Sequence, residues 1–592
     1  MGGPRDAKIV TMVQRIVLLV CLGAAVAAAQ QPPARDTSAA QNQQTPPTPQ
    51  GRITGRVLAG DNGRPLKRAR VFINAAELPG GRGALTDDDG IFDFTELPAG
   101  RYTINASKAG FVQLSYGQRR PLQAGTPLQL LDGQQLKGIE FRLPRGSVVA
   151  GAVYDENGDP MPGVSVRVMR YQYQQGERRM TPAGNAQTDD KGQYRVWGLM
   201  PGDYYVSAVA RNFTFGPPVG RPAGRGASIA SGRSGRGGLP ANVSTDDEES
   251  MAYAPTYYPG VSNVNDAKAV TVGLSQEALD ITFNMQLVRA ARVTGHVSNP
   301  DGSEVTNGNV NLANDSAPGR SQIGVNYGSR IDWDGSFSIA NVPPGRYIMR
   351  VRSNDSDTPQ FAAEPLTVSG EDIDDITVIV SPGATITGTV TLLPGSTPAP
   401  DLTNVRIVAP PIDQASFGPQ ANARVDRQGA FTLEGVPAGP HLLRANGNLR
   451  GWVLKSATAG SRDLTDAPFQ LRSGEVLSGV SLVLTDQIGE INGTVKTDQG
   501  VPVPDYTVLA FPIDPSLWRP QSRYIMTARP DQTGKFRIRG LPAGDYYLAT
   551  VDPAEQGEWF EPSYLDDHRA GAVRMTLADG DTKSHDFKLT LK

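Results

Sequence analysis

The sequence predicts an all-β protein that consists of five β-sandwich domains in tandem. One motif occurs five times, the segments beside it alternate between apolar and polar residues, and glycine and proline are abundant, at 66 and 47 of 592 residues. Seven or so short strands in each predicted domain, joined by such turns, are typical of a sandwich. The copies of the motif span residues 87–102, 189–204, 332–347, 426–441 and 531–546.

The motif begins with Asp-x-x-Gly, which favours a type I turn because Asp accepts a local backbone hydrogen bond and Gly relieves strain at the exit. Alternating apolar residues follow, such as Phe92 and Phe94, and predict a half-buried strand. A turn that contains Pro and ends in Gly stops this strand, because Pro cannot donate to a sheet. A second strand then returns, in most copies through an aromatic residue such as Tyr102.

The N-terminus has the pattern of an export signal. Arg15 precedes a short apolar run, and small residues that end in Ala-x-Ala follow, so we expect a signal peptide over 1–29 with cleavage before Gln30. Translation starts at either Met1 or Met12. A retained membrane anchor is less favoured because the run is short, so no membrane span is expected after signal removal. The predicted location is the periplasm, the outer cell surface or the extracellular space.

Composition restricts what the exported chain does. Cys21 is its only cysteine, so removal of the signal leaves neither disulfides nor thiolate metal ligands. Residues 30–50 are a tether rich in Pro and Gln that we expect to be disordered. The net charge of −3 gives no reason to expect nucleic acid as a partner.

Each predicted domain opens with a strand that contains Gly-x-Val or a close variant, and it closes with an alternating strand. These signals place the sandwiches at 51–145, 146–289, 290–382, 383–486 and 487–592. The second carries an insert over 212–252 that is rich in Gly, Pro, Arg and Ser and is expected to be disordered. The alternative for this insert is a basic arm for an anionic partner, which the acidic run Asp246 to Glu249 partly neutralises.

Together, the opening Gly-x-Val, a Pro-x-x-x-Val-x-Val segment near Pro160 and the Asp-x-x-Gly corner resemble carboxypeptidase regulatory-like domains. The resemblance extends over about 51–592, although the insert in the second domain and Pro440-His441 in the fourth depart from it. It implies a transthyretin-like, or carbohydrate-binding-like, β-sandwich. It also implies a binding or scaffolding role without peptidase activity, because these domains sit beside the catalytic domain of the enzymes that gave them their name.

The linkers between predicted domains are short, for example from Leu143 to Gly151 and from Val380 to Gly388. Linkers of this length do not act as flexible spacers. We therefore expect consecutive sandwiches to dock end to end as a semi-rigid, monomeric rod.

The sequence contains no recognisable catalytic, cofactor-binding or metal-binding motif, which predicts a protein that is not an enzyme. None of its four histidines lies in a His-Glu-x-x-His pattern. His568, preceded by Asp566 and Asp567, is more readily part of a solvated turn than a metal ligand. The Asp-x-x-Gly segments are interpreted as turns, and calcium binding is the alternative.

Aromatic clusters are the candidate ligand sites, because sugar rings stack on exposed aromatic faces. Tyr257 and Tyr258 in the second domain and Trp559 and Tyr564 in the fifth follow the corner strands at matching places. Packing in the core is the alternative interpretation. Trp333 lies within a predicted turn and is expected to be exposed.

These observations favour an exported, non-catalytic scaffold that acts in cell-surface adhesion or matrix interaction, with a glycan or a surface protein as partner. Two alternatives remain open. One is a carbohydrate-binding protein of a polysaccharide-utilisation or envelope system, and the other is an accessory subunit of a secreted peptidase or glycosidase.

Overall fold

The computed structural model describes most of the chain from residue 51 onward. The predicted signal peptide (1–29), the tether (30–50) and most of the insert lie outside the described residues, and strand β14 already begins at Met251, within the predicted insert. The described ranges are 51–118, 123–174, 176–210, 250–315, 327–355, 358–393, 395–412, 420–449, 451–552, 555 and 557–589.

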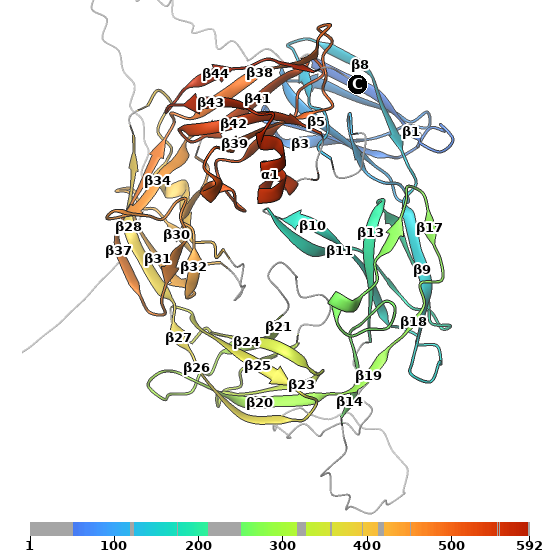
Figure 1. Ribbon diagram of the computed structural model, residues 1–592, viewed down its shortest axis with the longest axis vertical. Coiled ribbons are helices and arrows are strands. Elements are labelled where there is room, and N and C mark those ends of the chain that lie inside the picture. Colours follow the sequence, from blue (N-terminus) through green and yellow to red (C-terminus); the bar gives the residue numbers. More distant parts are fainter. Residues whose placement is uncertain are drawn as a thin grey trace, which may run out of the picture. The chain divides into compact units, whose positions relative to one another are not determined.

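The predicted all-β fold is confirmed (Figure 1). The sheets fall into five successive groups, which we call repeats 1 to 5 and delimit by the boundaries that the sequence predicted. Each repeat has two main sheets, and repeats 2 and 4 each have a further two-stranded one. That each repeat is an independent domain stays a prediction.

The opening strand lies in the interior of the first sheet of every repeat. It pairs antiparallel with the strand after the Asp turn and parallel with the closing strand. In sheet order, repeat 1 has β4 (Ile91–Leu97), β1 (Gly51–Ala59) and β8 (Gln135–Leu143), and repeat 2 has β12 (Gln193–Leu199), β9 (Ser147–Tyr154) and β17 (Glu277–Ala278), with β18 (Phe283–Asn284) also on β9. Repeat 3 has β23 (Ser336–Val342), β20 (Ala291–Ser298) and β26 (Ile373–Ile379), and repeat 4 has β31 (Ala430–Val436), β28 (Ala384–Leu392), β37 (Val476–Thr485), β34 (Val453–Ala459) and β35 (Arg462–Asp463). Repeat 5 has β41 (Lys535–Leu541), β38 (Gly489–Thr497) and β44 (Thr582–Ser584), with β45 (Phe587–Leu589) also on β38.

The second sheet faces the first across the core. Its strands are β3 (Leu78–Leu85), β2 (Arg70–Ala75), β5 (Gly100–Ser107), β6 (Leu114–Ser115) and β7 (Leu128–Leu130) in repeat 1, and β11 (Glu177–Gln187), β10 (Ser165–Gln174), β13 (Gly202–Val209), β15 (Thr256–Tyr257) and β16 (Val270–Val272) in repeat 2. In repeat 3 they are β22 (Tyr327–Arg330), β21 (Gly308–Asn314), β24 (Gly345–Ser353), β25 (Gln360–Val368) and β27 (Ser381–Pro382). In repeat 4 they are β30 (Asn422–Arg424), β29 (Val405–Val408) and β33 (Arg444–Gly447), and in repeat 5 they are β40 (Met526–Ala528), β39 (Thr507–Pro512), β42 (Gly544–Val551) and β43 (Val573–Leu577).

A few elements lie outside these sheets. Repeat 2 adds the pair β14 (Met251–Ala254) and β19 (Gln286–Arg289), and repeat 4 adds the pair β32 (Gly439–His441) and β36 (Phe469–Leu471). The one α-helix of the described chain, α1 (Pro562–Arg569), belongs to repeat 5. Four short 3-10 helices are η1 (Val264–Asp266), η2 (Leu402–Asn404), η3 (Pro515–Leu517) and η4 (Glu558–Phe560).

The glycine of each opening strand lies against the backbone of the closing strand. No side chain fits in this space, because real Cβ atoms do not approach an oxygen so closely. The distance from an added Cβ to the facing carbonyl oxygen would be 2.0 Å for Gly55 and Ile139, 2.1 Å for Gly151 and Ile281, 2.1 Å for Gly295 and Ile376, 2.0 Å for Gly388 and Val480, and 1.8 Å for Gly493 and His585.

The Asp turn is tied to the opening strand. In repeat 1, Asp87 Oδ1 accepts the backbone N–H groups of Asp89 and Ile91 at 3.0 and 2.7 Å, which confirms the predicted turn. Gly90 has a φ of +73°. Its carbonyl accepts the N–H of Val57 at 2.8 Å, and the equivalent bonds join Val153 to Gly192, Val297 to Gly335, Val390 to Gly429 and Val495 to Gly534 at 2.7–2.9 Å.

The aromatic residue that follows the Pro-containing turn closes the corner. Tyr102 is fully buried, and its hydroxyl donates to the carbonyl of Pro98 at 2.8 Å. In repeat 4, His441 takes the same place, with Nε2 2.9 Å from the carbonyl oxygen of Pro437. A polar contact of this kind, which we call the clasp, thus closes the corner in all five repeats. In the remaining three, the tyrosine hydroxyl donates to a backbone carbonyl: Tyr204 to that of Met200, Tyr347 to that of Pro343 and Tyr546 to that of Pro542.

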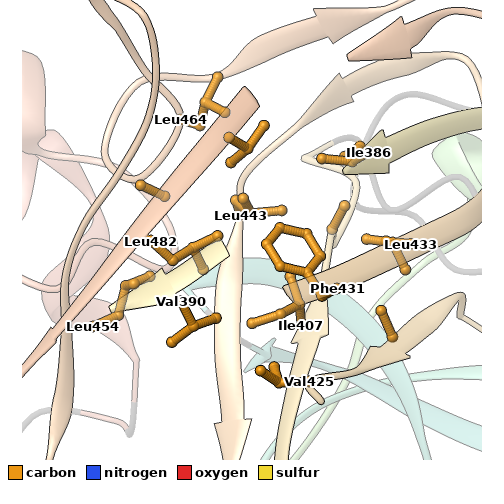
Figure 2. Packing of buried hydrophobic residues seen from close by; sticks show 14 of the residues in the cluster. Ile386, Val390, Ile407, Val425, Phe431, Leu433, Leu443, Leu454, Leu464 and Leu482 are labelled. Atoms are coloured by element: carbon orange, nitrogen blue, oxygen red, sulfur yellow. The ribbon is translucent and has the colours of Figure 1, made fainter. Parts of the chain in front are cut away.

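An apolar core fills the space between the two sheets of each repeat. Figure 2 shows the core of repeat 4, where Phe431 and Leu433 of β31 meet Ile407 of β29 and Leu482 of β37. Full burial of such a side chain contributes about 1.5–3 kcal/mol. The alternation predicted from the sequence therefore supplies the main stabilising force.

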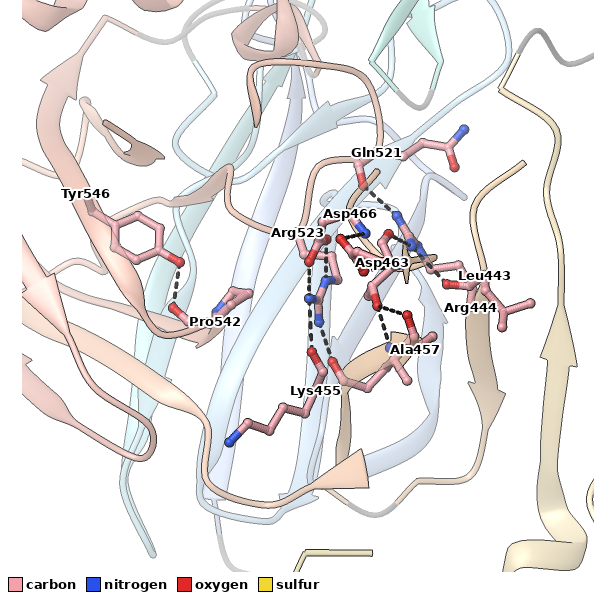
Figure 3. A network of polar contacts seen from close by, with 12 residues as sticks. Leu443, Arg444, Lys455, Ala457, Asp463, Asp466, Gln521, Arg523, Pro542 and Tyr546 are labelled. Carbon is pink, nitrogen blue, oxygen red and sulfur yellow. Dashed lines mark hydrogen bonds and ion pairs between the residues drawn. The ribbon is translucent and has the colours of Figure 1, made fainter. Parts of the chain in front are cut away.

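Polar contacts join repeats 4 and 5. The guanidinium of Arg523 forms a bidentate pair with Asp466, at 2.9 and 2.5 Å, and donates to the carbonyls of Leu454 and Lys455 (Figure 3). Both side chains of this pair are only 17% exposed. Because the two charges are paired and hydrogen-bonded, the cost of their burial is offset.

Hydrogen bonds also join repeats 1 and 5, which are not neighbours in the sequence. The Arg529 guanidinium donates to the carbonyl oxygens of Ala124 and Gly117, and the Gln532 side chain exchanges two bonds with the backbone of Gln129 at 2.9 and 3.0 Å. These bonds lie between repeats that are far apart in the sequence, and the semi-rigid rod stays a prediction. Sequence patterns do not reveal contacts of this kind.

We expect Gly295→Ala to lower the free energy of unfolding by about 3 kcal/mol or more, because its Cβ would clash with the Ile376 carbonyl. Calorimetry of the full chain measures this as an earlier transition. Gly571→Ala is the control, since a Cβ there meets nothing within 4 Å. Equal stability of the two variants would contradict the proposed constraint.

Tyr204→Phe is expected to cost about 1–3 kcal/mol, because it leaves the Met200 carbonyl without its buried donor. Chemical denaturation followed by intrinsic fluorescence measures the loss. The neighbouring Tyr205→Phe, outside the corner, is expected to change stability much less. Matching losses in both variants would show that the corner bond is not the cause.

Candidate functional site

The candidate aromatic residues of repeat 2 lie on a segment that crosses from one sheet to another. Strand β14 pairs with β19, and β15, which follows after one residue, pairs with β13. The segment continues through Tyr258 and Pro259, joined by a cis peptide, to Gly260 at a φ of +127°. Backbone pairing on both sides therefore holds this segment in place.

Tyr257 is buried rather than presented to solvent. It is 7% exposed and packs with Met169 and Met180 on the face of the second sheet that points away from the sandwich core. Burial raises its pKa to about 12. The ring thus forms part of an apolar cover over β10 and β11.

Tyr258 lies on the opposite side of the segment, against the core. Its ring meets Phe283 edge to face, with centroids 6.2 Å apart. The ring is half-buried. Its neighbours Pro259 and Gly260 reach the surface and line an open groove.

The groove beside Tyr258 has a volume of about 570 Å³. Its lining combines the polar side chains of Glu156, Thr282, Asn284 and Gln286 with Pro259, Gly260, Phe283, Met285 and Leu287. This mixture of hydrogen-bonding groups and apolar surface is suited to a small polar ligand such as a sugar.

Two hydrogen bonds order the polar side of this groove. The hydroxyl of Tyr253 donates to Glu156 Oε2 at 2.7 Å, and Gln286 Nε2 donates to the carbonyl of Gly260 at 2.5 Å. Burial, together with the bond to the Glu156 carboxylate, raises the pKa of Tyr253. Glu156 is thereby held at the mouth of the groove as an acceptor.

In repeat 5, Trp559 and Tyr564 also contribute to an apolar cover. Both are half-buried and pack with Leu565 of α1 over Phe511 of β39 and Tyr547 of β42. The Tyr564 ring lies 4.4 Å from the His568 ring, centroid to centroid, and burial raises the Tyr564 pKa to about 12. Whether sugars bind at any of the four predicted aromatic residues stays a prediction.

The most exposed tryptophans lie elsewhere. Trp333 is 82% exposed in the Asp turn of repeat 3, and Trp197 is 60% exposed on β12 of repeat 2. Reasoning from the sequence anticipated the first and missed the second. The alternation of β12, with Tyr194 and Val196 inward, already places Trp197 on the outer face.

Two further observations concern metal binding and membrane-spanning helices. Among the described residues, no three His, Cys, Asp or Glu side chains come together as a metal ion requires. No helix within this part of the chain has the length and apolar character needed to cross a membrane.

Comparison with known proteins found one matching family model, over the first part of the chain. The structure defines a protein of tandem β-sandwich modules. Residues 52–143 and 148–215 match the family described as "Carboxypeptidase regulatory-like domain", so the chain contains this domain in repeats 1 and 2, as the resemblance implied. A comparison with curated proteins gave no match.

Several solved structures show distant likeness. The Bacillus anthracis TIE protein has 11% identity and a TM-score of 0.14, over 74% of this chain and 73% of that one. A minor pilin of Streptococcus agalactiae has 14% identity and a TM-score of 0.21, over 40% and 96%. A putative carbohydrate binding protein from Bacteroides uniformis has 7% identity and a TM-score of 0.13, over 27% and 88%. Likenesses this low carry no argument about function.

Tyrosine titration distinguishes covered rings from open ones. Because burial raises the pKa values of Tyr257 and Tyr564 to about 12, we expect both to ionise above pH 10. The stability that their neutral forms contribute is complete below pH 10 and is lost as the pH rises through the folded-state pKa.

The measurement is tyrosinate absorbance of the full chain beside Tyr257→Phe and Tyr564→Phe. Each variant should lose amplitude only from the phase above pH 10. Loss of amplitude near pH 10 itself would show that the substituted ring is open to solvent, as a sugar-stacking platform requires.

Proposed function

We propose that this protein is an exported, non-catalytic binding and scaffold protein that acts in cell-surface adhesion or matrix interaction. One observation carries the proposal: the recurring polar residues of the motif are engaged with the backbone. Asp87 caps its own turn, and the Tyr102 hydroxyl is bonded to a carbonyl. The motif therefore builds the scaffold and leaves ligand recognition to the positions that vary between repeats.

The match to carboxypeptidase regulatory-like domains supports a non-catalytic role in the sense that the resemblance implied. It also keeps open an accessory role beside a secreted peptidase or glycosidase. Co-purification of such an enzyme with the exported chain would favour that alternative.

Carbohydrate binding is the second candidate function, and the groove of repeat 2 favours it. Glu156 supplies an acceptor, Asn284 supplies both a donor and an acceptor, and Pro259 supplies an apolar edge. These are the groups that orient a sugar ring, whose hydroxyls both donate and accept. Of the predicted pair Tyr257 and Tyr258, only Tyr258 would then support the groove, through its contact with the lining residue Phe283.

The test is a glycan array and polysaccharide pull-down with the signal-free chain, alongside binding to surface and matrix proteins. If the groove binds sugar, Asn284→Ala should weaken binding about tenfold, equivalent to about 1.4 kcal/mol. Trp559→Ala and Tyr257→Phe test the predicted aromatic residues in the same assay.

Each outcome has a distinct meaning. Saturable glycan binding that Asn284→Ala weakens supports the groove, whereas glycan binding that only Trp559→Ala weakens transfers the site to repeat 5. Binding to a surface or matrix protein without glycan binding supports adhesion alone. Absence of binding to every glycan and protein would overturn the proposed function.

A further inference from the structure

Trp197 is a large apolar side chain in a place where the fold does not need one. It lies on β12 with 60% of its surface exposed, between the inward residues Val196 and Leu199. In the sheet it is opposite Val148 of β9. The ring therefore stands on the outer face of the first sheet of repeat 2.

The other repeats serve as internal controls for this position. In every repeat, the second buried residue of the corresponding strand is followed by an exposed one. Only repeat 2 has an aromatic ring there, since the corresponding residues are Thr95, Ala340, Glu434 and Arg539. The sandwich thus folds without a large apolar residue at this point.

Small side chains surround the ring on the central strand. The residues of β9 that point outward are Val148, Ala150 and Ala152, which alternate with the core residues Val149 and Val153. Val148 and Ala152 are themselves covered, at 5% and 7% exposed, so Trp197 is the ring that this part of the face presents to solvent. Beyond them, Leu279, at 54% exposed, follows β17, which pairs with β9 (Figure 1).

An ion pair spans the same face. Arg195, two residues before Trp197, donates through Nη2 to Glu277 Oε1 at 2.6 Å. The side chains are 52% and 48% exposed, and the bond to Arg195 lowers the pKa of Glu277. Because exposed pairs contribute little to stability, this pair is available to exchange its bond for contacts to a ligand.

We propose that this face, made of Trp197, Arg195 and Glu277, binds a polysaccharide chain. The inference rests on the proposed binding function and names its ligand class. One pyranose ring stacks on the indole of Trp197 through its apolar C–H face. Hydroxyl groups of that sugar or the next one accept from Arg195 and donate to Glu277.

A sugar fits this face better than a protein does. Protein interfaces are depleted of Glu, whereas the Trp197 ring shares its face with the Glu277 carboxylate of the ion pair. An isolated ring with low neighbours also provides a flat platform, and stacking requires such a platform. The face is distinct from the groove, which is lined by Glu156, Pro259 and Asn284.

The decisive variant is Trp197→Thr, because repeat 1 has Thr95 at the equivalent position and folds with it. Trp333→Gln is the matched control: it removes another exposed tryptophan and introduces the residue found at Gln532 in the corresponding turn of repeat 5. Thermal unfolding should show both variants to be as stable as the parent chain.

Binding is measured by affinity electrophoresis of the signal-free chain in gels that contain xylan, mannan, mixed-linkage β-glucan or chondroitin sulfate, and by pull-down on cellulose and chitin. We expect at least one polysaccharide to retard the parent chain. Trp197→Thr should raise its dissociation constant at least tenfold, and Trp333→Gln should leave it unchanged.

Three results would overturn the inference. If Trp197→Thr binds as tightly as the parent and Asn284→Ala does not, the groove is the site and the proposed function survives. If both tryptophan variants weaken binding equally, the effect is not specific to this face. If no polysaccharide binds while a surface or matrix protein does, adhesion stands without a sugar surface.

Discussion

Each repeat depends on a main-chain hydrogen bond between the carbonyl of its turn glycine and the N–H of the valine in its opening strand. The bond joins Gly90 to Val57 and recurs in the other four repeats at 2.7–2.9 Å. It forms only because the turn glycine adopts a positive φ and the opening glycine lets the closing strand approach. Asp and Tyr then secure the two ends of the strand between them. A local sequence of turn residues thereby fixes the pairing of strands that are far apart in the chain.

This constraint separates the scaffold from the surfaces that differ between repeats. The residues that form the turn and the clasp are nearly the same in all five repeats. Where His441 replaces tyrosine, its Nε2 takes the place of the hydroxyl and faces the equivalent carbonyl. Outward positions are free to vary, and repeat 2 departs furthest through its insert, its groove beside Pro259 and its exposed Trp197. We therefore propose that recognition takes place on repeat 2 and that the other repeats mainly supply framework.

Local patterns predicted the fold well because turns and alternating strands are encoded over a few residues. The Asp87 turn, the strand with Phe92 and Phe94, and the apolar cores all follow from such patterns. The sites were harder to predict. Tyr257 lies in a second apolar layer outside the sandwich, and the alternation of residues along a strand does not predict such a layer. Arg523 and Asp466 come from different repeats, so their pairing depends on a contact between repeats that no local pattern encodes. The same alternation predicts that Trp197 points outward, but one outward residue does not by itself mark a site.

The apolar cover in repeat 5 buries the outer face of a strand whose inner face already lies in the core. All six residues of β39 are buried, because the sandwich core lies on one side and α1 with Trp559 and Phe560 lies on the other. Three layers exclude water from both faces of this strand, so its amide hydrogens exchange with solvent only when the whole repeat opens. Strand β39 is thereby a well-protected part of repeat 5.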